Sequence, residues 1–429
     1  MQTAPFWTDD FPRPTDLPVQ APPERTDVAI VGSGYTGLSA ARVLARAGYD
    51  VTVLDAETIG WGASSRNGGM MTTGLKDDAQ HICKQYGNEL GRRLWEWSLD
   101  AVDFVEKSVG EAGIDCDFAR RGYLYLAYKP GHVEAMQESV AWHARQLDYH
   151  DMHFVPREEL SEEIGTAAYF GGVVDSRAAG LHPAKYVFGL ARIAAAEGVR
   201  LAEQSPVTAI DKAGEEWRLE ISSKRSLYAS QIFIATNGYT TDVLPYIRNG
   251  VFPVGSYIIT TEPLSPALQA ELSPRGRMFV DSKNFLNYFR LTPDGRMLFG
   301  GRHNLSPNLD VTESAHMMRR RMLEVFPQLA DAAVSHTWSG NLGLTFDLMP
   351  HAGRIASGPH AGIAYAYGYA GHGVAVASYL GHEIGRMLSG ERASVTFADI
   401  RQQRYFFTRY DSLYLPFVSA WFRILDRVR

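Results

Sequence analysis

The chain has 429 residues, of which 45% are hydrophobic and 21% charged, and this is the composition of a globular protein with room for two or three domains. Its formal net charge of -6 argues against a nucleic-acid partner, which requires a basic face. Its two cysteines exclude a disulfide framework and a cysteine-based metal cluster, and no metal site is predicted.

The N-terminal segment MQTAPFWTDDFPRPTD is acidic and proline-rich, whereas a secretory signal is basic and then apolar. We therefore expect a cytoplasmic protein in which Cys83 and Cys116 are reduced thiols. Because prolines recur up to residue 23, residues 1–26 are predicted to form an extended arm on the surface.

A βαβ unit is predicted directly after this arm. Residues 27–31 form a buried-strand run, residues 36–48 have helical spacing and end in a glycine, and residues 49–55 form the next strand. The turn between the first strand and the helix, GSGYTG, matches the G-x-G-x-x-G pattern of dinucleotide-binding proteins. Asp55 ends the second strand, close to the spacing of about 20 residues expected for the acid that binds the ribose.

Each part of this unit has a physical role in holding a dinucleotide. Gly32 allows the tight turn, Gly34 lets the backbone approach a pyrophosphate, and Gly37 lets the helix pack closely on the strand. Free N–H groups at the start of the helix bind phosphate. A carboxylate at Asp55 accepts from ribose hydroxyls but repels a 2′-phosphate, which favours FAD or NAD over NADP. The predicted contacts in this unit are Gly32, Gly34, Tyr35, Thr36, Gly37, Asp55 and Ala56.

The glycine-rich stretch GWGASSRNGGM at residues 60–70 distinguishes between FAD and NAD. Its small residues allow the backbone to follow a ligand beyond the ribose, where FAD continues to its ribityl chain and isoalloxazine ring. The sequence has no second G-x-G-x-x-G, a motif that enzymes passing electrons from NAD(P)H to FAD often carry twice. Both features favour FAD alone. The predicted contacts in the stretch are Gly62, Ala63, Ser64, Arg66, Asn67, Gly68, Gly69 and Met70.

The remaining chain alternates between helical and strand-like segments. Residues 81–169 are mainly helical, residues 199–238 and 250–305 are rich in strands, and a helix is predicted over residues 312–330. Another helix begins near Gly371 and runs through Gly390. The aromatic tail at residues 401–429 is expected to dock on the protein body rather than on a membrane, and no membrane-spanning segment is predicted.

Motifs spread over the chain resemble the D-amino acid oxidase superfamily of flavoproteins, and within it most closely the γ-glutamylputrescine oxidoreductase-like amine oxidases. The resemblance extends from about residue 5 to residue 425. The motifs are VGSGYTGLSAA, GWGASSRNGG, GLHPAKYVFGLA, ATNGY, TTEPL, YFRLTPDGRMLFGG, W-S-G-x-x-x-x-T-x-D-x-x-P at 338–350 and GYAGHGV at 368–374.

This resemblance implies an α/β flavoprotein of two discontinuous domains. A Rossmann-like FAD-binding domain would comprise residues 27–80, 170–245 and 335–400. A substrate domain built on an antiparallel sheet would comprise residues 81–169 and 246–334, leaving residues 401–429 as the C-terminal tail. The further cofactor contacts that the resemblance implies are Val207, Thr236, Asn237, Gly340, Gly371, His372, Gly373 and Val374.

The activity implied is oxidation of a C–N bond in a small-molecule amine. Hydride transfer to FAD gives an imine that hydrolyses to an aldehyde or ketone, and oxygen or another acceptor takes the electrons, with hydrogen peroxide as the product of oxygen. The helix that begins near Gly371 would stabilise the negative charge of reduced flavin through its N-terminus.

Three residues are candidates for a catalytic role, each with a structural alternative. Arg66 stands where some relatives bind FAD covalently through a histidine, which predicts noncovalent FAD here, and it either contacts the flavin or substrate or is structural. His372 is either a proton donor at the site or a packed histidine. Tyr257 either belongs to an aromatic cage for the amine or packs within a sheet. His182 is expected to be structural.

Residues 340–344 (GNLGL) bear on whether the substrate has a carboxylate next to the reacting carbon. Amino acid oxidases have an arginine in a G-x-R-P arrangement here, which clamps the α-carboxylate of the substrate. Without it, the chain is expected to act on an amine, or on a substrate whose carboxylate is far from the reacting carbon. Arg290 and Arg302 are candidates for binding such a distal carboxylate, and the alternative for both is a surface charge on a strand.

Other functions remain open at this stage. Within the same class, the alternative is an oxidase or dehydrogenase of N-methyl or cyclic amino acids such as sarcosine, proline or pipecolate. An NAD(P)H-dependent flavin monooxygenase is disfavoured by the missing second nucleotide motif, and a non-enzymatic flavin-binding protein is a third possibility. The sequence makes no prediction of the oligomeric state.

Overall fold

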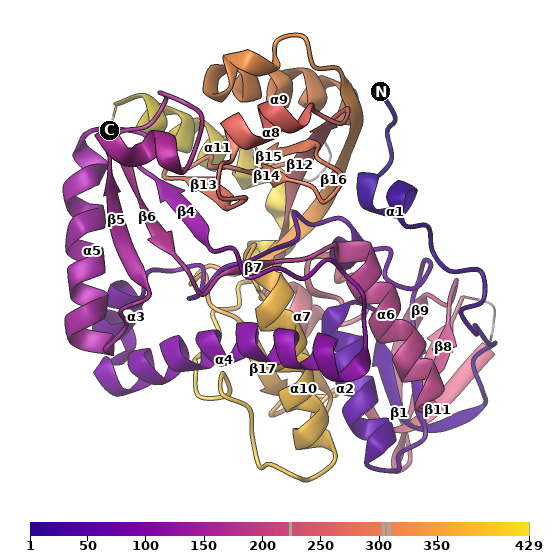
Figure 1. Cartoon of the computed structure of the whole chain (residues 1–429). Coiled ribbons are helices and arrows are strands. Elements are labelled where there is room, and N and C mark those ends of the chain that lie inside the picture. Colours follow the sequence, from indigo (N-terminus) through magenta and orange to yellow (C-terminus); the bar gives the residue numbers. More distant parts are fainter. Residues whose placement is uncertain (223–224, 303–304, 307–309, 429) are drawn as a thin grey trace.

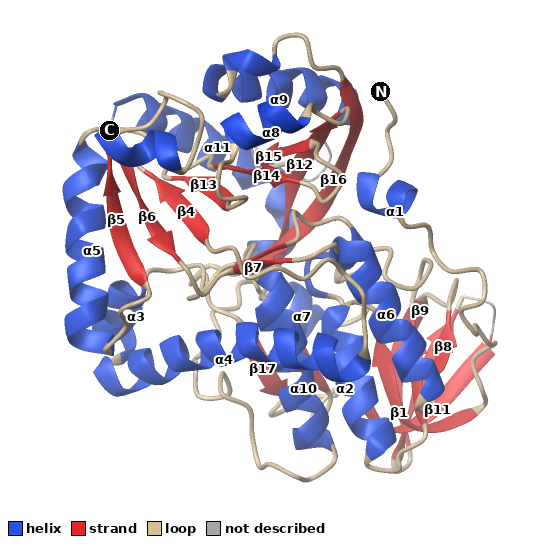
Figure 2. Cartoon of the chain, in the orientation of Figure 1, coloured by secondary structure: helices blue, strands red, loops and turns tan. Residues whose placement is uncertain are grey.

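The computed structural model describes the chain except for residues 223–224, 303–304, 307–309 and 429 (Figure 1). Two large sheets organise the described residues, and helices pack around both (Figure 2). One sheet is mainly parallel and the other mainly antiparallel, which confirms the predicted α/β architecture with a Rossmann-like part and a second part built on an antiparallel sheet.

The first sheet contains the predicted βαβ unit. Its strands are β1 (Arg25–Val31), β2 (Val51–Leu54), β8 (Arg200–Ala202), β9 (Val207–Ala213), β10 (Glu216–Ile221), β11 (Arg225–Ile234), β17 (His351–Arg354) and β18 (Ala364–Tyr367). The order is β17-β18-β11-β1-β2-β8, and β10 and β9 continue from β11 by antiparallel pairing. Val28 and Ile30 of β1 enter the core on one face of the sheet, and Ala29 enters the core on the other. Burial on both faces is why this strand is apolar throughout.

Helices α2 (Tyr35–Arg46), α6 (Pro183–Ala196) and α10 (Gly373–Leu388) pack together on this sheet, and α4 (Asn88–Ala112) packs against α10. Glycines bring α10 unusually close to α2. A Cβ added to Gly381 would overlap the carbonyl oxygen of Thr36, and one added to Gly385 would lie 2.7 Å from the Cβ of Val43. This close crossing places the N-termini of both helices on the same side of the sheet.

The second sheet has the order β16-β12-β15-β14-β13-β4-β6-β5. Its strands are β4 (Tyr123–Leu126), β5 (Met152–Pro156), β6 (Gly171–Asp175), β12 (Phe252–Thr261), β13 (Met278–Asp281), β14 (Asn287–Leu291), β15 (Met297–Gly301) and β16 (Val334–Leu344). Helices α8 (Pro266–Leu272) and α9 (Val311–Val325) lie at its outer side, and α5 (Gly131–Leu147) flanks β5 and β6 (Figure 2). The remaining elements are α3 (Ala79–Tyr86), α7 (Pro245–Arg248) and a small sheet of β3 (Met70–Met71) and β7 (Ala179–Gly180).

Two strands fall outside the domain that their predicted segment implied. β6 and β16 belong to the second sheet, although residues 170–245 and 335–400 were assigned to the FAD-binding domain. The chain crosses between the sheets within these segments, because β16 pairs with β12 over nearly its whole length before the chain returns to β17. The boundaries predicted at residues 170 and 335 are therefore displaced to about residues 176 and 345.

The N-terminal arm is not simply extended, as residues 1–26 were predicted to be. It contains the short helix α1 (Phe6–Asp10), and the Trp7 side chain is fully buried. The carboxylates of Asp9 and Asp10 bind His336 and His182 at 3.0 and 3.1 Å. The arm is thus anchored to both sheets, because His336 lies on β16 and His182 caps α6.

The C-terminal tail ends in α11 (Asp411–Val428), which packs on the protein body along one side. Arg248 binds Asp411 at 3.0 Å, and the Ser419 hydroxyl accepts from the Leu305 backbone at 2.9 Å. Its opposite side leaves Leu413, Phe417, Trp421 and Ile424 exposed. Among the described residues, no helix combines the length and the apolar content needed to cross a membrane.

We predict that Gly381→Ala lowers the free energy of unfolding by about 1–3 kcal/mol, because the added methyl group must displace the backbone of α2. Chemical denaturation followed by circular dichroism measures this change. Gly110→Ala is the matched control: Gly110 is exposed on α4, and an added Cβ meets nothing within 4 Å. This control should gain up to about 1 kcal/mol from better helix propensity. Wild-type stability of the Gly381→Ala protein would contradict the close crossing.

Candidate active site

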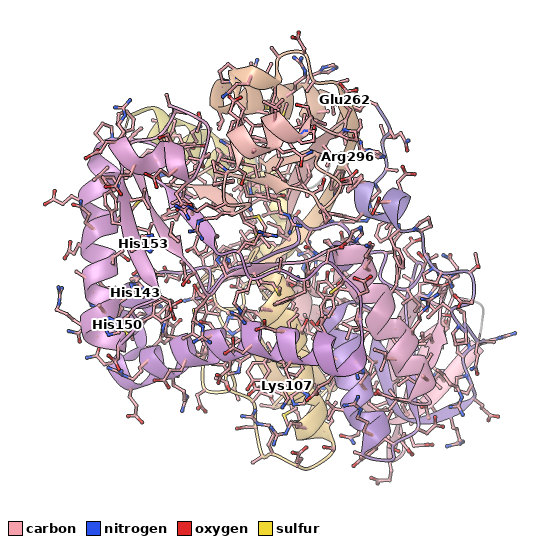
Figure 3. All side chains as sticks on the ribbon, viewed as in Figure 1. Lys107, His143, His150, His153, Glu262 and Arg296 are labelled. Atoms are coloured by element: carbon pink, nitrogen blue, oxygen red, sulfur yellow. The ribbon has the colours of Figure 1, made fainter. Side chains whose placement is uncertain are left out.

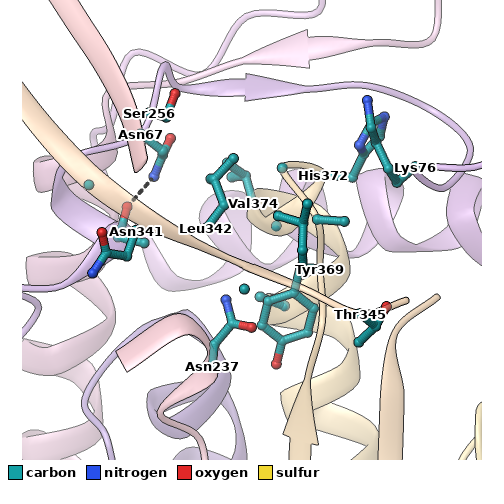
Figure 4. A pocket seen from close by; sticks show the side chains of 18 of the residues that line it. Asn67, Lys76, Asn237, Ser256, Asn341, Leu342, Thr345, Tyr369, His372 and Val374 are labelled. Atoms are coloured by element: carbon teal, nitrogen blue, oxygen red, sulfur yellow. Dashed lines mark hydrogen bonds between the residues drawn. The ribbon is translucent and has the colours of Figure 1, made fainter. Parts of the chain in front are cut away.

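A cavity of about 1400 Å³ is lined by residues of both sheets, and Figure 4 shows some of the side chains in its wall. It exceeds the roughly 300–1,000 Å³ of a site for one drug-sized ligand, so it has room for a dinucleotide and a second molecule. The predicted contacts that line it are Gly32, Gly34, Tyr35, Thr36, Asp55, Ala56, Gly62, Ala63, Ser64, Arg66, Asn67, Gly68, Met70, Val207, Thr236, Asn237, Gly340, Gly371, His372, Gly373 and Val374. Three predicted site residues, Gly37, Gly69 and Tyr257, do not line it.

The G-x-G-x-x-G turn fits a dinucleotide at one end of this cavity. Gly32 has a φ of +107°, and an added Cβ there would lie 2.8 Å from the carbonyl oxygen of Ala235. A Cβ on Gly34 would lie 2.8 Å from the Ser64 hydroxyl, and one on Gly37 would overlap the carbonyl oxygen of Gly32. Gly37 thus acts inside the fold by permitting close helix–strand packing, while Gly32 and Gly34 keep the cavity wall free of side chains.

Asp55 lies on the cavity wall and braces the turn. One carboxylate oxygen accepts from the Ser33 backbone N–H at 2.9 Å and from the Ser33 hydroxyl, and the other accepts from the Glu57 backbone at 3.0 Å. The separation of 22 residues between Ser33 and Asp55 agrees with a ribose-binding acid held beside the phosphate-binding turn.

The stretch 60–70 forms a braced wall of the same cavity. The Tyr35 backbone N–H donates to the Ser64 hydroxyl at 3.1 Å, and the Tyr35 hydroxyl donates to the Ser64 carbonyl at 2.6 Å. The Asn67 side-chain amide donates to the Ala63 carbonyl at 3.1 Å and accepts from the Gly69 N–H at 2.7 Å. Gly69 itself faces away from the cavity, where a Cβ would overlap the carbonyl oxygen of Leu181.

Three further side chains from outside this stretch donate to its backbone carbonyls. Trp338 Nε1 donates to Arg66 O at 2.7 Å, Trp7 Nε1 donates to Asn67 O at 2.8 Å, and Arg290 Nη1 donates to Gly69 O at 2.7 Å. Arg290 also reaches the Leu181 carbonyl at 3.3 Å. Arg290 does not line the cavity, so it ties the second sheet to the stretch and is not available for a substrate carboxylate.

Arg66 is held against the cavity wall by its own loop. Its Nε donates to the Trp61 carbonyl at 2.7 Å, and its guanidinium carbon lies 4.3 Å from the centroid of the Trp61 ring. Burial lowers the pKa of the Arg66 guanidinium, which nevertheless remains a cation.

The interpretation of Tyr257 as part of an amine cage is wrong, because its side chain points to the opposite face of β12. Ser256 and Ile258 face the cavity, whereas Tyr257 packs in the core beneath α9 and donates to the Ser306 carbonyl at 3.2 Å. Side chains alternate along a strand, so a shift of one residue exchanges the two faces. Sheet packing, the alternative given for Tyr257, is what the structure contains.

Tyr288 of β14, rather than Tyr257, is the tyrosine of the second sheet that lines the cavity beside Ser256. Its hydroxyl lies 2.9 Å from the Ser256 hydroxyl, and its ring lies 3.1 Å from where a Cβ on Gly68 would be. The aromatic ring therefore separates the second sheet from the cofactor-binding stretch. The alternation in NYFRL was the available signal, because Phe289 is buried in the core of the second domain and Tyr288 must then face the other way.

The N-terminus of α10 meets the cavity at His372. Burial and the nearby charge of Lys76 lower the pKa of His372 to about 3, so the imidazole is neutral at physiological pH. Its buried Nδ1 has no hydrogen-bond partner among the described residues. An orphaned ring nitrogen at a helix N-terminus is consistent with a polar ligand group at this end of the cavity.

Besides Arg66, which is held by Trp61, two cations that line the cavity have no counterion among the described residues. The side chains of Arg302 and Lys76 make no hydrogen bond or ion pair with any described residue, and both residues line the cavity; the Arg302 backbone carbonyl accepts from Arg321 Nη1 at 2.9 Å. Burial lowers the pKa of both, in Lys76 to about 8. The sequence had indicated Arg302 as a candidate but gave no signal for Lys76.

His182 is structural, as expected. Its Nδ1 accepts from the Lys185 backbone at 3.2 Å at the start of α6, and its Nε2 binds Asp10. It does not line the cavity.

Comparison with known proteins agrees with this geometry. Residues 27–387 match the family model described as DAO, FAD dependent oxidoreductase. The chain is 32% identical to γ-glutamylputrescine oxidoreductase of Escherichia coli (strain K12) over 94% of its own length and 93% of the relative's. It is 35% identical to a probable oxidoreductase, OrdL, of Haemophilus influenzae, over 87% and 85% of the two chains.

Solved structures with the same fold are more distant in sequence. The glycine oxidase of Geobacillus kaustophilus superposes with a TM-score of 0.73 at 20% identity, covering 89% of this chain and all of that one. The L-proline dehydrogenase of P. horikoshii superposes with a TM-score of 0.71 at 20% identity, covering 86% and 95%. The match over most of its length, together with a cavity that begins at a dinucleotide-binding turn, shows that this chain belongs to the DAO family of FAD-dependent oxidoreductases.

Proposed function

We propose that this chain oxidises a small-molecule amine at its C–N bond, that γ-glutamylated amines are its substrate class, and that oxygen is the acceptor. The amine loses two electrons and two protons to become an imine, and water converts the imine to an aldehyde and releases the nitrogen as ammonia or as an amine. Oxygen takes up the two electrons and two protons as hydrogen peroxide. The similarity to γ-glutamylputrescine oxidoreductase supports this class of substrate.

FAD supplies the hydride-accepting centre when it is bound. The residues of the chain would hold it and stabilise its charge. The glycine turn and the N-terminus of α2 would bind its phosphates, and the N-terminus of α10 with the neutral His372 would stabilise the negative charge that develops on reduction. Ser256 and Tyr288 would form the opposite wall, against the substrate.

The observation that carries this proposal is the wall at residues 340–344. Gly340, Leu342 and Leu344 of β16 line the cavity there and offer no positive charge (Figure 4). A carboxylate next to the reacting carbon would need a cation at this place, because an unpaired buried carboxylate is strongly disfavoured. This favours an amine over the sarcosine-, proline- and pipecolate-like alternatives, in which the carboxylate lies on the carbon beside the nitrogen.

We expect γ-glutamylputrescine to bleach the flavin absorption of the purified protein when the two are mixed without oxygen. Sarcosine and proline should do so at least about tenfold more slowly, because their carboxylate would meet the neutral wall at residues 340–344. Stopped-flow absorbance measures both rates, and a peroxide assay in air then tests oxygen against a dye acceptor. Faster reduction by sarcosine or proline than by γ-glutamylputrescine would exclude the proposal, and bleaching by NADPH alone would favour a monooxygenase.

We also propose that FAD is bound without a covalent link. Arg66 occupies the position of the linking histidine in some relatives and is held by Trp61. Cys83 and Cys116 do not line the cavity, and burial raises the pKa of Cys116 to about 12, so its thiol is protonated.

Acid precipitation of the loaded protein should therefore leave the yellow flavin in the supernatant and a colourless pellet. Absorbance of the two fractions measures this distribution. A pellet that stays yellow after washing in denaturant would demonstrate a covalent link.

A further inference from the structure

Arg302 and Lys76 approach the cavity from different parts of the fold. Arg302 directly follows β15, where Leu298 and Gly300 share its face of the sheet, and Gly300 is paired with Tyr288. Lys76 lies in the loop between β3 and α3, beside His372 at the start of α10 (Figure 4). The two cations thus approach one space from the second sheet and from the cofactor-binding side.

Their charges act on each other. Burial is the main cause that lowers the pKa of Lys76, and the charge of Arg302 lowers it further. Two nearby cations without a counterion are unfavourable in a cavity, where water screens them less than on the surface. Buried cations in proteins are normally paired, so this pair indicates that an anion belongs between them.

The carboxylates in the cavity wall do not supply that anion, because the aspartates there are bound elsewhere and the charge of Glu57 acts on Arg66. Asp281 accepts from the backbone and the side chain of Asn287 at 2.8 and 2.7 Å. Asp77 binds His81 at 2.6 Å, and Asp78 caps its own helix α3. The anion that completes the pair must therefore come from a ligand.

The phosphates of FAD do not suit this place either. They belong at the G-x-G-x-x-G turn and the N-terminus of α2, on the first sheet. Arg302 lies on the second sheet, on the face that carries Tyr288 and Ser256. The pair is therefore on the substrate side of the cavity.

We propose that Arg302 and Lys76 bind a carboxylate that the amine substrate carries at the end remote from the carbon that is oxidised. The planar guanidinium of Arg302 can hold a carboxylate through two parallel hydrogen bonds, and Lys76 adds a point charge. A γ-glutamyl amide has such a carboxylate, separated from the reacting carbon by the glutamyl chain and the diamine. This inference rests on the proposed function. The carboxylate-binding arginine that amino acid oxidases have at residues 340–344 is missing here, and Arg302 with Lys76 would bind a carboxylate farther from the reacting carbon.

The test compares two substrates that share the reacting amine. γ-Glutamylputrescine carries the carboxylate, and N-acetylputrescine has a neutral acyl group instead. In Arg302→Met and Lys76→Met proteins loaded with FAD, kcat/KM for γ-glutamylputrescine should fall on the order of 10- to 100-fold. The value for N-acetylputrescine should change less than about threefold, because no charged partner is lost. The Arg302→Lys protein should retain part of the preference in kcat/KM for γ-glutamylputrescine over N-acetylputrescine.

Lys107→Met is the control for removing a lysine. Lys107 lies on α4 with 73% of its side chain exposed (Figure 3), and it does not line the cavity. In the Lys107→Met protein, the ratio of kcat/KM for γ-glutamylputrescine over N-acetylputrescine should equal that of the wild type.

A second measurement is independent of turnover. γ-Glutamylbutylamide keeps the carboxylate and lacks the reacting amine, so it should bind and perturb the flavin spectrum without reducing it. Arg302→Met should raise its Kd on the order of 10-fold or more. If no amine reduces the wild-type flavin but this titration behaves as described, the proposed function fails and the carboxylate site stands.

Other outcomes overturn the site. An unchanged ratio of kcat/KM for the two putrescine derivatives, with an unchanged Kd for γ-glutamylbutylamide, excludes a carboxylate between Arg302 and Lys76. A shift of the flavin midpoint potential with an unchanged ratio would show that these cations balance the flavin charge instead.

The Lys76 contribution has its own pH signature. The pKa of Lys76 is lowered to about 8, so its charge is present below that pH and lost as the pH rises through it. The groups that face it are Arg302, which stays charged, His372, which stays neutral, and Asp77. The ratio of kcat/KM for γ-glutamylputrescine over N-acetylputrescine should fall above about pH 8, and Lys76→Arg should remove that fall. A ratio independent of pH in the wild type would contradict the role of Lys76.

Discussion

The backbone carbonyl groups of Arg66, Asn67 and Gly69 join the glycine-rich stretch at residues 60–70 to the second sheet and to the N-terminal arm. They accept from Trp338 of the second sheet, Trp7 of the N-terminal arm and Arg290 of β14, respectively, all between 2.7 and 2.8 Å. A glycine-rich stretch has few side chains with which to fix itself, so its backbone depends on donors from elsewhere. These three bonds set the height of the second sheet above the cofactor, and therefore the width of the space in which a substrate must fit.

The crossing of α2 and α10 fixes the other wall of that space. Because Gly381 lies against Thr36, both helices present their N-termini to one cavity, and the Tyr369 hydroxyl lies 2.7 Å from the Thr36 hydroxyl beside them. One terminus suits a pyrophosphate and the other a flavin that becomes negative on reduction. The helix N-termini thus offer partial charges of the backbone to a ligand in this cavity, whereas Arg66, Arg302 and Lys76 are full charges that line it without a counterion among the described residues.

The sequence predicted the parts of this arrangement that depend on local backbone. The role of the glycines in residues 32–37 and 60–70 could be predicted from the sequence, because only glycine tolerates such close backbone approaches. The sequence did not show in the same way which side chains of the second sheet face the cavity. Tyr257 and Tyr288 both lie on strands of that sheet, and which of them faces the cavity depends on a register that long-range pairing decides. Lys76 stands in a loop without a motif, and only its neighbours in space give it a role.

Arg290 and Arg302 show why residue type alone does not locate a binding group. Arg290 lies on β14 and Arg302 directly follows the neighbouring strand β15, and the sequence treats the two arginines alike. Arg290 is above Gly69 and Leu181, whose carbonyls occupy its donors, whereas Arg302 has no carbonyl or carboxylate within reach among the described residues. The difference is that one guanidinium is satisfied by the fold and the other is not. An arginine at the end of β15 instead of at residues 340–344 would leave the flavin chemistry unchanged and would change the distance from the reacting carbon at which a carboxylate is recognised.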